Sequence, residues 1–266
     1  MEIIKYVTQF ENMKDNKILG NPKLINSELN FKGKNNILFC ENDVKLENVI
    51  INFNGDNSVI YLASSLNSVK CVIYSNSNWF LGKNVIMGEN ISLNILEYQN
   101  IFIGDSCYFG NNVDMSTSDY YPIFDGESKK RINFSKSIVV GDHVMVGNNV
   151  LINRGVKIGS GAIVDNNSYL SMTVKIPSNV LVSGNPPKII NKNVFFVDKF
   201  LGSFDFSDLG NFNQYKSDVF IFQVVNNETL SLDKIDEILI KLDVDSRLEF
   251  IQKLFIKNKS KNRFSI

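Results

Sequence analysis

The chain has 266 residues, of which 44% are apolar and 21% are charged, which is typical of globular rather than disordered proteins. Its 28 basic residues balance 28 acidic ones, so the chain lacks the basic excess of a general nucleic-acid binder. No apolar run approaches the ~20 residues of a membrane-spanning helix, and the first residues do not resemble a signal peptide. The three cysteines have no metal-ligand spacing, so we predict no metal site and reduced thiols in a cytoplasmic protein.

A six-residue repeat runs from Ile138 to Val182. One apolar series is Val140, Val146, Ile152, Ile158, Val164, Leu170, Ile176 and Val182, and a second, two places earlier, is Ile138, Val144, Val150, Val156, Ala162, Ser168, Val174 and Val180. The 3.6-residue period of a helix does not explain this pattern. Because residues two apart point to the same side of a strand, each pair predicts a short strand with one buried face. The small residues that follow predict a corner every six residues, and three such units would close one triangular coil.

A looser repeat precedes this segment. Asn36, Asn57, Asn78 and Asn100 each open an apolar unit, and asparagine suits the left-handed backbone of tight corners. We therefore predict coils over residues 35–192, after an N-terminal lead-in at residues 1–34.

The repeat is interrupted between Met115 and Ile138. Pro122 and Gly126 indicate irregular structure there, so we predict that residues 116–137 form a loop that leaves the coil. Loops that project from a rigid scaffold commonly carry function.

Residues 193–266 lack the repeat and form a predicted C-terminal extension. Residues 219–225 favour a strand, and apolar residues spaced along one face predict two helices, the first from Ser231 and the second from Asp243 or Asp245. We expect the helices to cover an open end of the solenoid or to contact a neighbouring subunit.

Three stretches carry a family resemblance: IVVGDHVMVGNNV from Ile138, GVKIGSGA from Gly155 and VSGNPPKII from Val182. They resemble the hexapeptide-repeat acyltransferases, and the chain looks most similar to O-acetyltransferases of capsular, sialic-acid or lipopolysaccharide sugars. The resemblance implies a mainly β fold, a left-handed parallel β-helix (β-solenoid), here with a C-terminal α-helical or α+β extension. It also implies acetyl-CoA as the donor, a glycan or nucleotide-sugar acceptor, and a homotrimer with active sites in grooves between adjacent coils.

The family's catalytic base is a histidine in a loop pattern similar to Ser-Asp-x-His-x-Ile-Phe-Asp. Aligned on Ser118, Asp119 and Phe124, that histidine falls on Tyr121. A phenol with a pKa of ~10 is ionised to about one part in a thousand at pH 7, and the loss of a positioned base costs about 10²–10⁴-fold in rate. By the resemblance Tyr121 occupies the catalytic position, although a phenol is a poor base there. Asp119 either orients the base, as the resemblance implies, or serves as an acid of raised pKa.

His143 is the only histidine in the sequence. It stands between the inward positions Val140 and Val144, which predicts that it lies on the outside of the coil near a subunit groove. It is either an exposed surface histidine or a replacement for the missing base.

The resemblance implies a cofactor site formed by Met145, Gly147, Arg154, Ala162, Ser183, Asn185 and Lys188. In that site Lys188 would contact a CoA phosphate, and Arg154 would do the same. Ser183 and Asn185 would shape the approach to the phosphate. Gly147 and Ala162 are small where the pantetheine arm would pass, although turn geometry explains them equally well. Met145 stands where the family often has tryptophan.

Three hypotheses for the function remain open. The first is acetyl-CoA-dependent O-acetylation of a bacterial surface glycan, with Tyr121 in place of the family histidine. The second is a catalytically silent relative that binds a glycan or a partner protein. The third is N-acetylation of an amino sugar, whose amine is a stronger nucleophile and depends less on a base.

Overall fold

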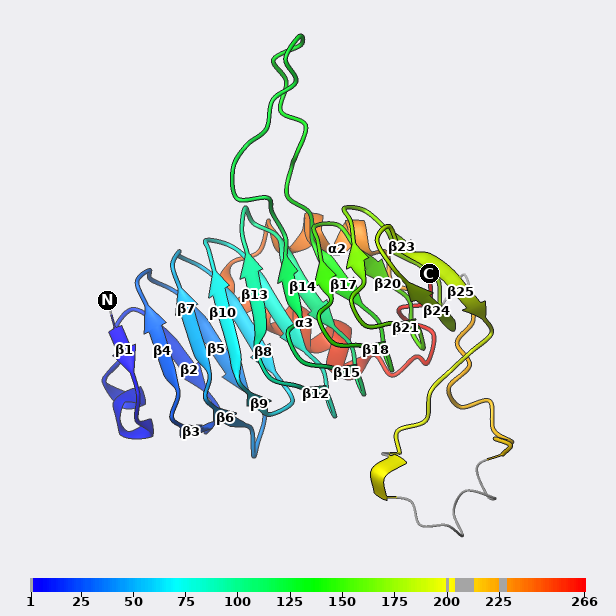
Figure 1. Ribbon diagram of the computed structural model, residues 1–266. Coiled ribbons are helices and arrows are strands. Elements are labelled where there is room, and N and C mark those ends of the chain that lie inside the picture. The colour runs from blue at the N-terminus through cyan, green and yellow to red at the C-terminus, as the bar shows by residue number, and fades with distance from the viewer. Residues whose placement is uncertain (1, 200, 204–212, 225–228) are drawn as a thin grey trace.

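The computed structural model describes residues 2–199, 201–203, 213–224 and 229–266. Most of the chain winds into a β-solenoid whose strands stack in parallel sheets, and the α-helices of the described residues lie near the C-terminus (Figure 1). This architecture confirms the predicted fold class. No helix in the described ranges combines the length and the apolar character needed to cross a membrane.

Three sheets form the faces of the solenoid. The first contains β1 (Glu2–Ile4), β4 (Glu28–Phe31), β7 (Ile50–Phe53), β10 (Val69–Ile73), β13 (Ile91–Ile95), β16 (Asp114–Ser116), β19 (Leu151–Ile152) and β22 (Tyr169–Leu170). The second contains β2 (Lys17–Leu19), β5 (Ile37–Cys40), β8 (Val59–Leu62), β11 (Asn78–Leu81), β14 (Asn100–Ile103), β17 (Ile138–Val140), β20 (Lys157–Ile158) and β23 (Lys175–Ile176). The third contains β12 (Ile86–Met87), β15 (Tyr108–Phe109), β18 (Met145–Val146), β21 (Ile163–Val164), β24 (Val180–Ser183) and β25 (Lys188–Lys192), and β3 (Lys23–Ile25), β6 (Lys45–Glu47) and β9 (Leu66–Asn67) form a separate small sheet in the first coils.

The length of the coils explains why the repeat is readable in only part of the sequence. Downstream, Val139 pairs with Lys157 and Lys157 with Lys175, a step of 18 residues that equals three six-residue units. Upstream, Asn78 pairs with Asn100, a step of 22 residues, so longer corners obscure the period. The coil also begins before residue 35, because β2, β3 and β4 already pair in parallel with the next coil.

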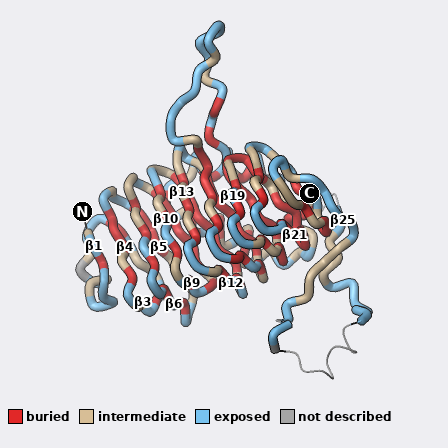
Figure 2. The backbone as a smooth tube through the Cα atoms, in the orientation of Figure 1, coloured by how far each residue is buried: buried red, intermediate tan, exposed pale blue. Residues whose placement is uncertain are grey.

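The two apolar series of the repeat fill the inside of the coils. Val140, Val146, Val156 and Ile158 are completely buried, and Ser168 is buried with them at 1% exposure. Figure 2 shows this buried interior running the length of the solenoid, with exposed residues at the corners. The series therefore point inwards as predicted.

The asparagines that open the upstream units play two different roles. Asn57 has a φ of 59°, as expected for a left-handed corner. Asn36, Asn78 and Asn100 are instead buried, and the Asn78 Nδ2 donates to the Asn100 Oδ1 at 2.6 Å. The prediction was therefore wrong for these three, because an amide that bonds to its equivalent in the next coil is better satisfied inside the strand than at the corner.

The two predicted helices are present in the C-terminal extension. They are α2 (Leu232–Leu239), whose N-cap is Ser231, and α3 (Val244–Ile251), whose N-cap Asp243 accepts a hydrogen bond from the Ser246 backbone N–H at 2.8 Å. A π-helical segment, η3 (Gln252–Lys257), follows α3, and short 3-10 helices occur at η1 (Val7–Asn12) and η2 (Leu201–Ser203).

The helices cover a face of the solenoid rather than an end. The Phe255 ring lies 4.4 Å from that of Phe80 and 5.0 Å from that of Phe102, on the outer face of the second sheet. The coil ends are covered differently: β1 pairs antiparallel with β4, and β25 pairs antiparallel with β24. The predicted end cap is therefore formed by strands.

Two buried arginines attach the extension to coil corners. Arg263, 2% exposed, binds Asp105 at 3.0 Å and Asp142 at 2.8 Å, and Arg247 donates to the Asn57 carbonyl oxygen at 2.7 Å. The strand predicted at 219–225 does not form over residues 219–224, and residue 225 lies outside the described residues. These residues form an irregular arm that packs against the coil instead.

Candidate active site

The predicted loop leaves the solenoid between β16 and β17 and projects far from it as a two-legged hairpin (Figure 1). Phe124 and Arg131 form an antiparallel bridge between its legs. Much of its apolar surface is exposed: Tyr121 by 80%, Phe124 by 57% and Ile132 by 62%. Such surface is costly to leave in water, so the loop is suited to contact another molecule.

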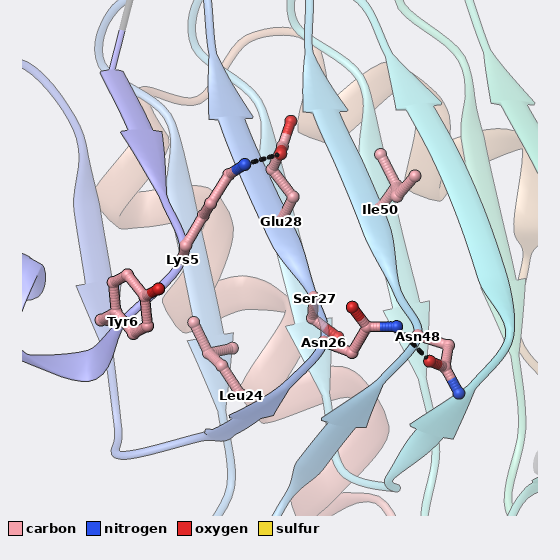
Figure 3. Close-up of a pocket in the computed structure, with 8 residues that line it drawn as sticks. All are labelled: Lys5, Tyr6, Leu24, Asn26, Ser27, Glu28, Asn48 and Ile50. Carbon is pink, nitrogen blue, oxygen red and sulfur yellow. Dashed lines mark hydrogen bonds and ion pairs between the residues drawn. The ribbon is translucent and has the colours of Figure 1, made fainter.

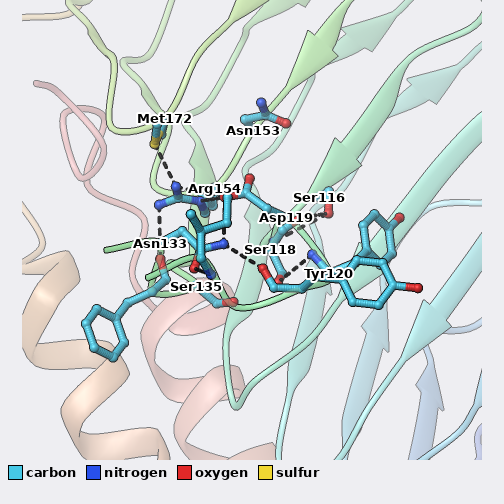
Figure 4. A network of polar contacts seen from close by, with 12 residues as sticks. Ser116, Ser118, Asp119, Tyr120, Asn133, Ser135, Asn153, Arg154 and Met172 are labelled. Carbon is cyan, nitrogen blue, oxygen red and sulfur yellow. Dashed lines mark hydrogen bonds and ion pairs between the residues drawn. The ribbon is translucent and has the colours of Figure 1, made fainter. Parts of the chain in front are cut away.

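An ion pair between Asp119 and Arg154 fixes the base of the loop. The Arg154 Nε donates to the Asp119 Oδ2 at 2.9 Å, and a terminal nitrogen of Arg154 lies at the same distance from that oxygen (Figure 4). The guanidinium also donates to the Phe134 carbonyl oxygen at 3.1 Å and contacts the Met172 Sδ at 2.7 Å. With a side chain only 4% exposed, Arg154 ties the loop to the next coil through charge-assisted bonds.

Asn133 joins the two legs of the loop beside this pair. Its Nδ2 donates to the Asp119 Oδ2 at 3.1 Å and to the Tyr121 carbonyl oxygen at 2.8 Å, while its Oδ1 accepts the Ile123 backbone N–H at 2.6 Å. At 3% exposure the amide is almost fully enclosed. The backbone on both sides of Tyr121 is therefore held in place.

A second ion pair supports the outgoing side of the loop. Arg131 binds Glu97 through two hydrogen bonds of 2.6 and 2.7 Å, and the Ser135 hydroxyl donates to the same carboxylate at 2.5 Å. The bond from Arg131, partly opposed by burial, and the bond from Ser135 lower the pKa of Glu97 to about 2. Glu97 thus stays ionised at physiological pH and acts as an anchor rather than as a general base.

Tyr121 sits on this fixed base with its side chain in solvent. No hydrogen bond to its phenolic oxygen is found among the described residues, so the phenol is available to a ligand. Its neighbour Tyr120, which has a φ of 66°, turns back toward the first sheet, where burial and then Asp114 raise the pKa of its phenol.

His143 does not belong to this group of residues. A whole strand, β17, separates it from the loop, and its ring lies between those of Phe196 and Phe220, each 4.0 Å away. Its Nε2 lies 2.9 Å from the Phe196 carbonyl oxygen, and the residue is 3% exposed. The prediction of an exposed histidine was wrong because the C-terminal arm covers this corner, and a base so enclosed cannot meet an acceptor hydroxyl.

Several predicted cofactor residues meet at a third corner. Gly147 packs on the turn of the next coil, where an added Cβ would lie 2.7 Å from Asn166, and the Ser183 hydroxyl donates to the Asp165 Oδ2 at 3.1 Å in that same turn. Asn185 and Lys188 follow in the connection from β24 to β25. Met145 lies on the adjoining face of the third sheet. The structure therefore brings five of the seven predicted residues to one corner and its edge.

The other two predicted cofactor residues are placed elsewhere. Ala162 is completely buried and points into the core, so its side chain cannot line a surface groove. Arg154 is engaged by Asp119, Phe134 and Met172, which leaves little of its guanidinium for a CoA phosphate. Both assignments are corrected on these grounds.

A shallow hollow of about 540 Å³ lies in the first coils, away from the loop (Figure 3). Two polar contacts cross it: an ion pair between Lys5 and Glu28 at 2.9 Å, and a hydrogen bond from the Asn26 Nδ2 to the Asn48 Oδ1 at 2.7 Å. These polar groups already satisfy one another, so the hollow offers no group placed for chemistry.

Comparison with known proteins relates this geometry to characterised structures. No family model matches the chain, and a search of curated proteins also finds no match. Among solved structures, the polySia specific acetyltransferase NeuO is 31% identical, with a TM-score of 0.65 over 71% of this chain and 81% of that one. The chain belongs to the hexapeptide-repeat acetyltransferases. The polysialic acid O-acetyltransferase OatWY is 24% identical, with a TM-score of 0.59 over 75% of this chain and 99% of its own, and shares the fold.

Within this acetyltransferase fold, sequence reasoning missed Asn133 and Glu97. Each bonds to residues on a different segment, and nothing in the residues around them indicates that contact. It also missed a lysine column in the second sheet, although a signal was present. Lys157 and Lys175 are one 18-residue coil apart, which predicts that they stack.

We predict that replacing Arg154 by methionine lowers the free energy of unfolding by about 2 kcal/mol, because the Asp119 carboxylate loses its charged partner. Urea denaturation would measure this. The double variant Asp119→Asn/Arg154→Met should regain about 1 kcal/mol, since it removes the unpaired charge. As a control, Arg131→Met should cost under about 1 kcal/mol, because its partner Glu97 is 43% exposed. Equal losses in the two single variants would contradict an anchoring role for Arg154.

We also predict a pH-dependent contribution from His143. Burial lowers its pKa below 6.5, against the opposing effect of the hydrogen bond with Phe196. The unfolded chain therefore binds this proton more readily than the folded one. The contribution of His143 to the free energy of unfolding is fully present above about pH 6.5 and is lost as the pH falls below it. Thermal unfolding between pH 7.5 and 5.5 should show a larger drop for the wild type than for His143→Asn, which keeps a residue tolerant of the 54° φ. Identical profiles would show that the enclosed ring does not titrate in this range.

Proposed function

We propose that this chain transfers an acetyl group from acetyl-CoA to a hydroxyl of a glycan on the bacterial surface, such as a capsular, sialic-acid or lipopolysaccharide sugar. The observation that carries the proposal is the likeness to NeuO, which is described as a polySia specific acetyltransferase. The fixed loop base with an exposed side chain at its end adds a site of the kind that acyl transfer needs.

The reaction requires three things of the protein. It must hold the thioester, present a hydroxyl to its carbonyl carbon, and receive the hydroxyl proton as the C–O bond forms and the C–S bond breaks. In our proposal Tyr121 occupies the place of the family base. Arg154 holds Asp119, and Asn133, which is bonded to Asp119, fixes the Tyr121 backbone. In our proposal Tyr121 accepts a hydrogen bond from the acceptor hydroxyl, the hydroxyl proton passes to the departing CoA thiolate so that CoA leaves as a thiol, and most of the rate comes from positioning the two substrates.

The donor site is proposed at the corner formed by Gly147, Ser183 and Lys188. Lys188 is exposed, and no ion pair to it is found in the ranges that the structure describes. An ammonium group and a hydroxyl at a turn suit the phosphates of CoA. Asn185 and Met145 would line the approach to this corner.

A second candidate function is a silent relative that binds glycan without acetylating it. It is supported by the alignment of the loop, in which Tyr121 stands where the family has its catalytic imidazole. The same scaffold and exposed loop would then serve only recognition.

We propose that the working form is a homotrimer. An apolar stripe runs along the outer face of the third sheet through the paired residues Ile86, Tyr108, Met145, Ile163 and Leu181. Ile86 is 55% exposed and Tyr108 43%, so the stripe is uncovered in one chain, as is the apolar loop. A neighbouring copy that buries both surfaces would remove this cost.

A cytoplasmic location is proposed for the same reaction. Acetyl-CoA is an intracellular donor, and Cys40, Cys71 and Cys107 are all free and buried, as suits a reducing compartment.

Thiol release from acetyl-CoA in the presence of polysialic acid would test the activity. We expect turnover by the wild type, a fall of about tenfold or more in Tyr121→Phe, and a rise of about 10²-fold in Tyr121→His, because imidazole is the better base near neutral pH. Tyr6→His, at a tyrosine 69% exposed in the first coils, is the matched control and should leave the rate unchanged. An inactive wild type with an active Tyr121→His would establish the silent relative, and failure to bind CoA would remove the proposal.

Light scattering would test the oligomeric state. We expect a mass three times the 30.1 kDa of the chain, and Ile86→Lys should shift it toward the monomer by placing a charge in the apolar stripe. The control Ile3→Lys, at a residue 43% exposed on β1, should leave the mass unchanged. A monomeric wild type would exclude the trimer.

A further inference from the structure

A hollow of about 320 Å³ lies at the base of the loop, between the second sheet and α2. Lys136, Lys157 and Lys175 line one side of it, and Asp233 and Asp236 of α2 line the other. We call these five residues the lysine pocket. Lys157 and Lys175 are direct partners in neighbouring strands, so their side chains leave the sheet one strand spacing, about 4.8 Å, apart.

The pocket is continuous with the base of the catalytic loop. The Lys136 backbone N–H donates to the Thr117 carbonyl oxygen at 3.1 Å, where the chain leaves the coil, and the Gly155 N–H donates to the Lys136 carbonyl oxygen at 3.2 Å. Gly155 follows Arg154, the residue that anchors Asp119. A molecule held in the pocket would therefore lie beside the loop that carries Tyr121.

The charges in the pocket are unequally satisfied. Lys157 is 17% exposed and binds Asp233 at 2.8 Å, but Asp233 itself is 87% exposed. The partly buried Asp236 carboxylate accepts hydrogen bonds at its Oδ1 from Asn100 at 2.7 Å and from Ser137 at 2.8 Å, which hold it against the pocket wall. Lys136 and Lys175 are exposed, and neither lies within 4.0 Å of an aspartate carboxylate of the pocket, so the pocket retains positive charge facing solvent.

We propose that the lysine pocket binds a carboxylate of the glycan acceptor, with the acceptor displacing Asp233 from Lys157. This inference rests on the proposed function and adds to it the place where a carboxylate of the acceptor binds. Asp233 shows by its own position that a carboxylate fits against Lys157, and its exposure means that it can be exchanged at little cost.

The composition of the pocket favours a carboxylate over a phosphate. Three ammonium groups face two carboxylates, so the surplus is about one positive charge, which matches a monoanion. The pocket has no free arginine for two-point binding of phosphate, because Arg154 is engaged elsewhere. The proposed donor corner at Lys188 lies on the far side of the first sheet, which leaves this pocket for the acceptor.

Calorimetric titration with a sialic acid oligomer and with its carboxyl-reduced, neutral form would test the proposal. The wild type should bind the acidic oligomer about tenfold more tightly than the neutral one, and Lys136→Gln/Lys175→Gln should abolish that preference. The matched control is Lys23→Gln/Lys45→Gln, which removes two exposed lysines that are also partners in adjacent strands. If the control loses as much affinity as the pocket variant, or if the neutral oligomer binds the wild type equally well, the proposal is wrong.

A second variant should change the affinity for the acidic oligomer in the opposite direction. Asp233→Asn removes the carboxylate that competes for Lys157, so it should tighten binding of the acidic oligomer about threefold and leave the neutral oligomer unaffected. A damaged structure would weaken binding rather than strengthen it. Unchanged or weaker binding of the acidic oligomer by Asp233→Asn would overturn the displacement.

Two further measurements keep this inference separate from the proposed function. CoA affinity should be the same in the wild type and in Lys136→Gln/Lys175→Gln; a loss confined to CoA would assign the pocket to donor phosphates instead. If both proteins transfer acetyl groups with the same KM for the acidic oligomer, the proposed acetyltransferase function stands and the proposed acceptor site is wrong. If binding depends on the carboxylate but no acetyl group is transferred, the proposed binding site stands and the proposed acetyltransferase function is wrong.

Discussion

The structure depends on one constraint, which is that each coil stacks directly on the next at the spacing of parallel strands, about 4.8 Å. An added Cβ on Gly104 would lie 2.5 Å from the Asp142 Oδ1 of the following coil, so only glycine fits there. That same oxygen accepts the Asp105 backbone N–H at 2.7 Å. A corner that has lost its strand partners is thereby satisfied by a side chain from the next coil, and the solenoid can turn without leaving buried polar groups unpaired.

The same stacking determines where charge can gather. A residue in one coil has its equivalent immediately above and below, so two lysines separated by one coil become neighbours on a flat face. Lys157 and Lys175 are neighbours for this reason, and Asp233 from α2 partly neutralises them. Arg154 uses the same geometry, because it reaches across one coil to hold the departing loop through Asp119.

The C-terminal extension decides which surfaces of the solenoid remain open. Its helices bury the aromatic column of the second sheet, and Arg263 holds its end against Asp105 and Asp142. Its arm encloses His143 between two phenylalanine rings. The extension leaves accessible the loop with Tyr121, the corner with Lys188, the lysine pocket and the apolar third sheet, and these are the surfaces on which the proposed chemistry and assembly rely.

Short-range patterns in the sequence were enough to predict the coil, its inward residues from Ile138 to Val182, the interruption by the loop and both C-terminal helices. These features depend on side-chain size and polarity at fixed short spacings, which are local properties. The tertiary structure alone decided the partners of the polar groups. Arg154 meets an aspartate 35 residues away rather than a cofactor, and the histidine expected at the surface is covered by an arm whose Phe196 lies 53 residues further along the chain. Such contacts form only when the coils have stacked and the extension has folded back, so no spacing within the sequence could have indicated them.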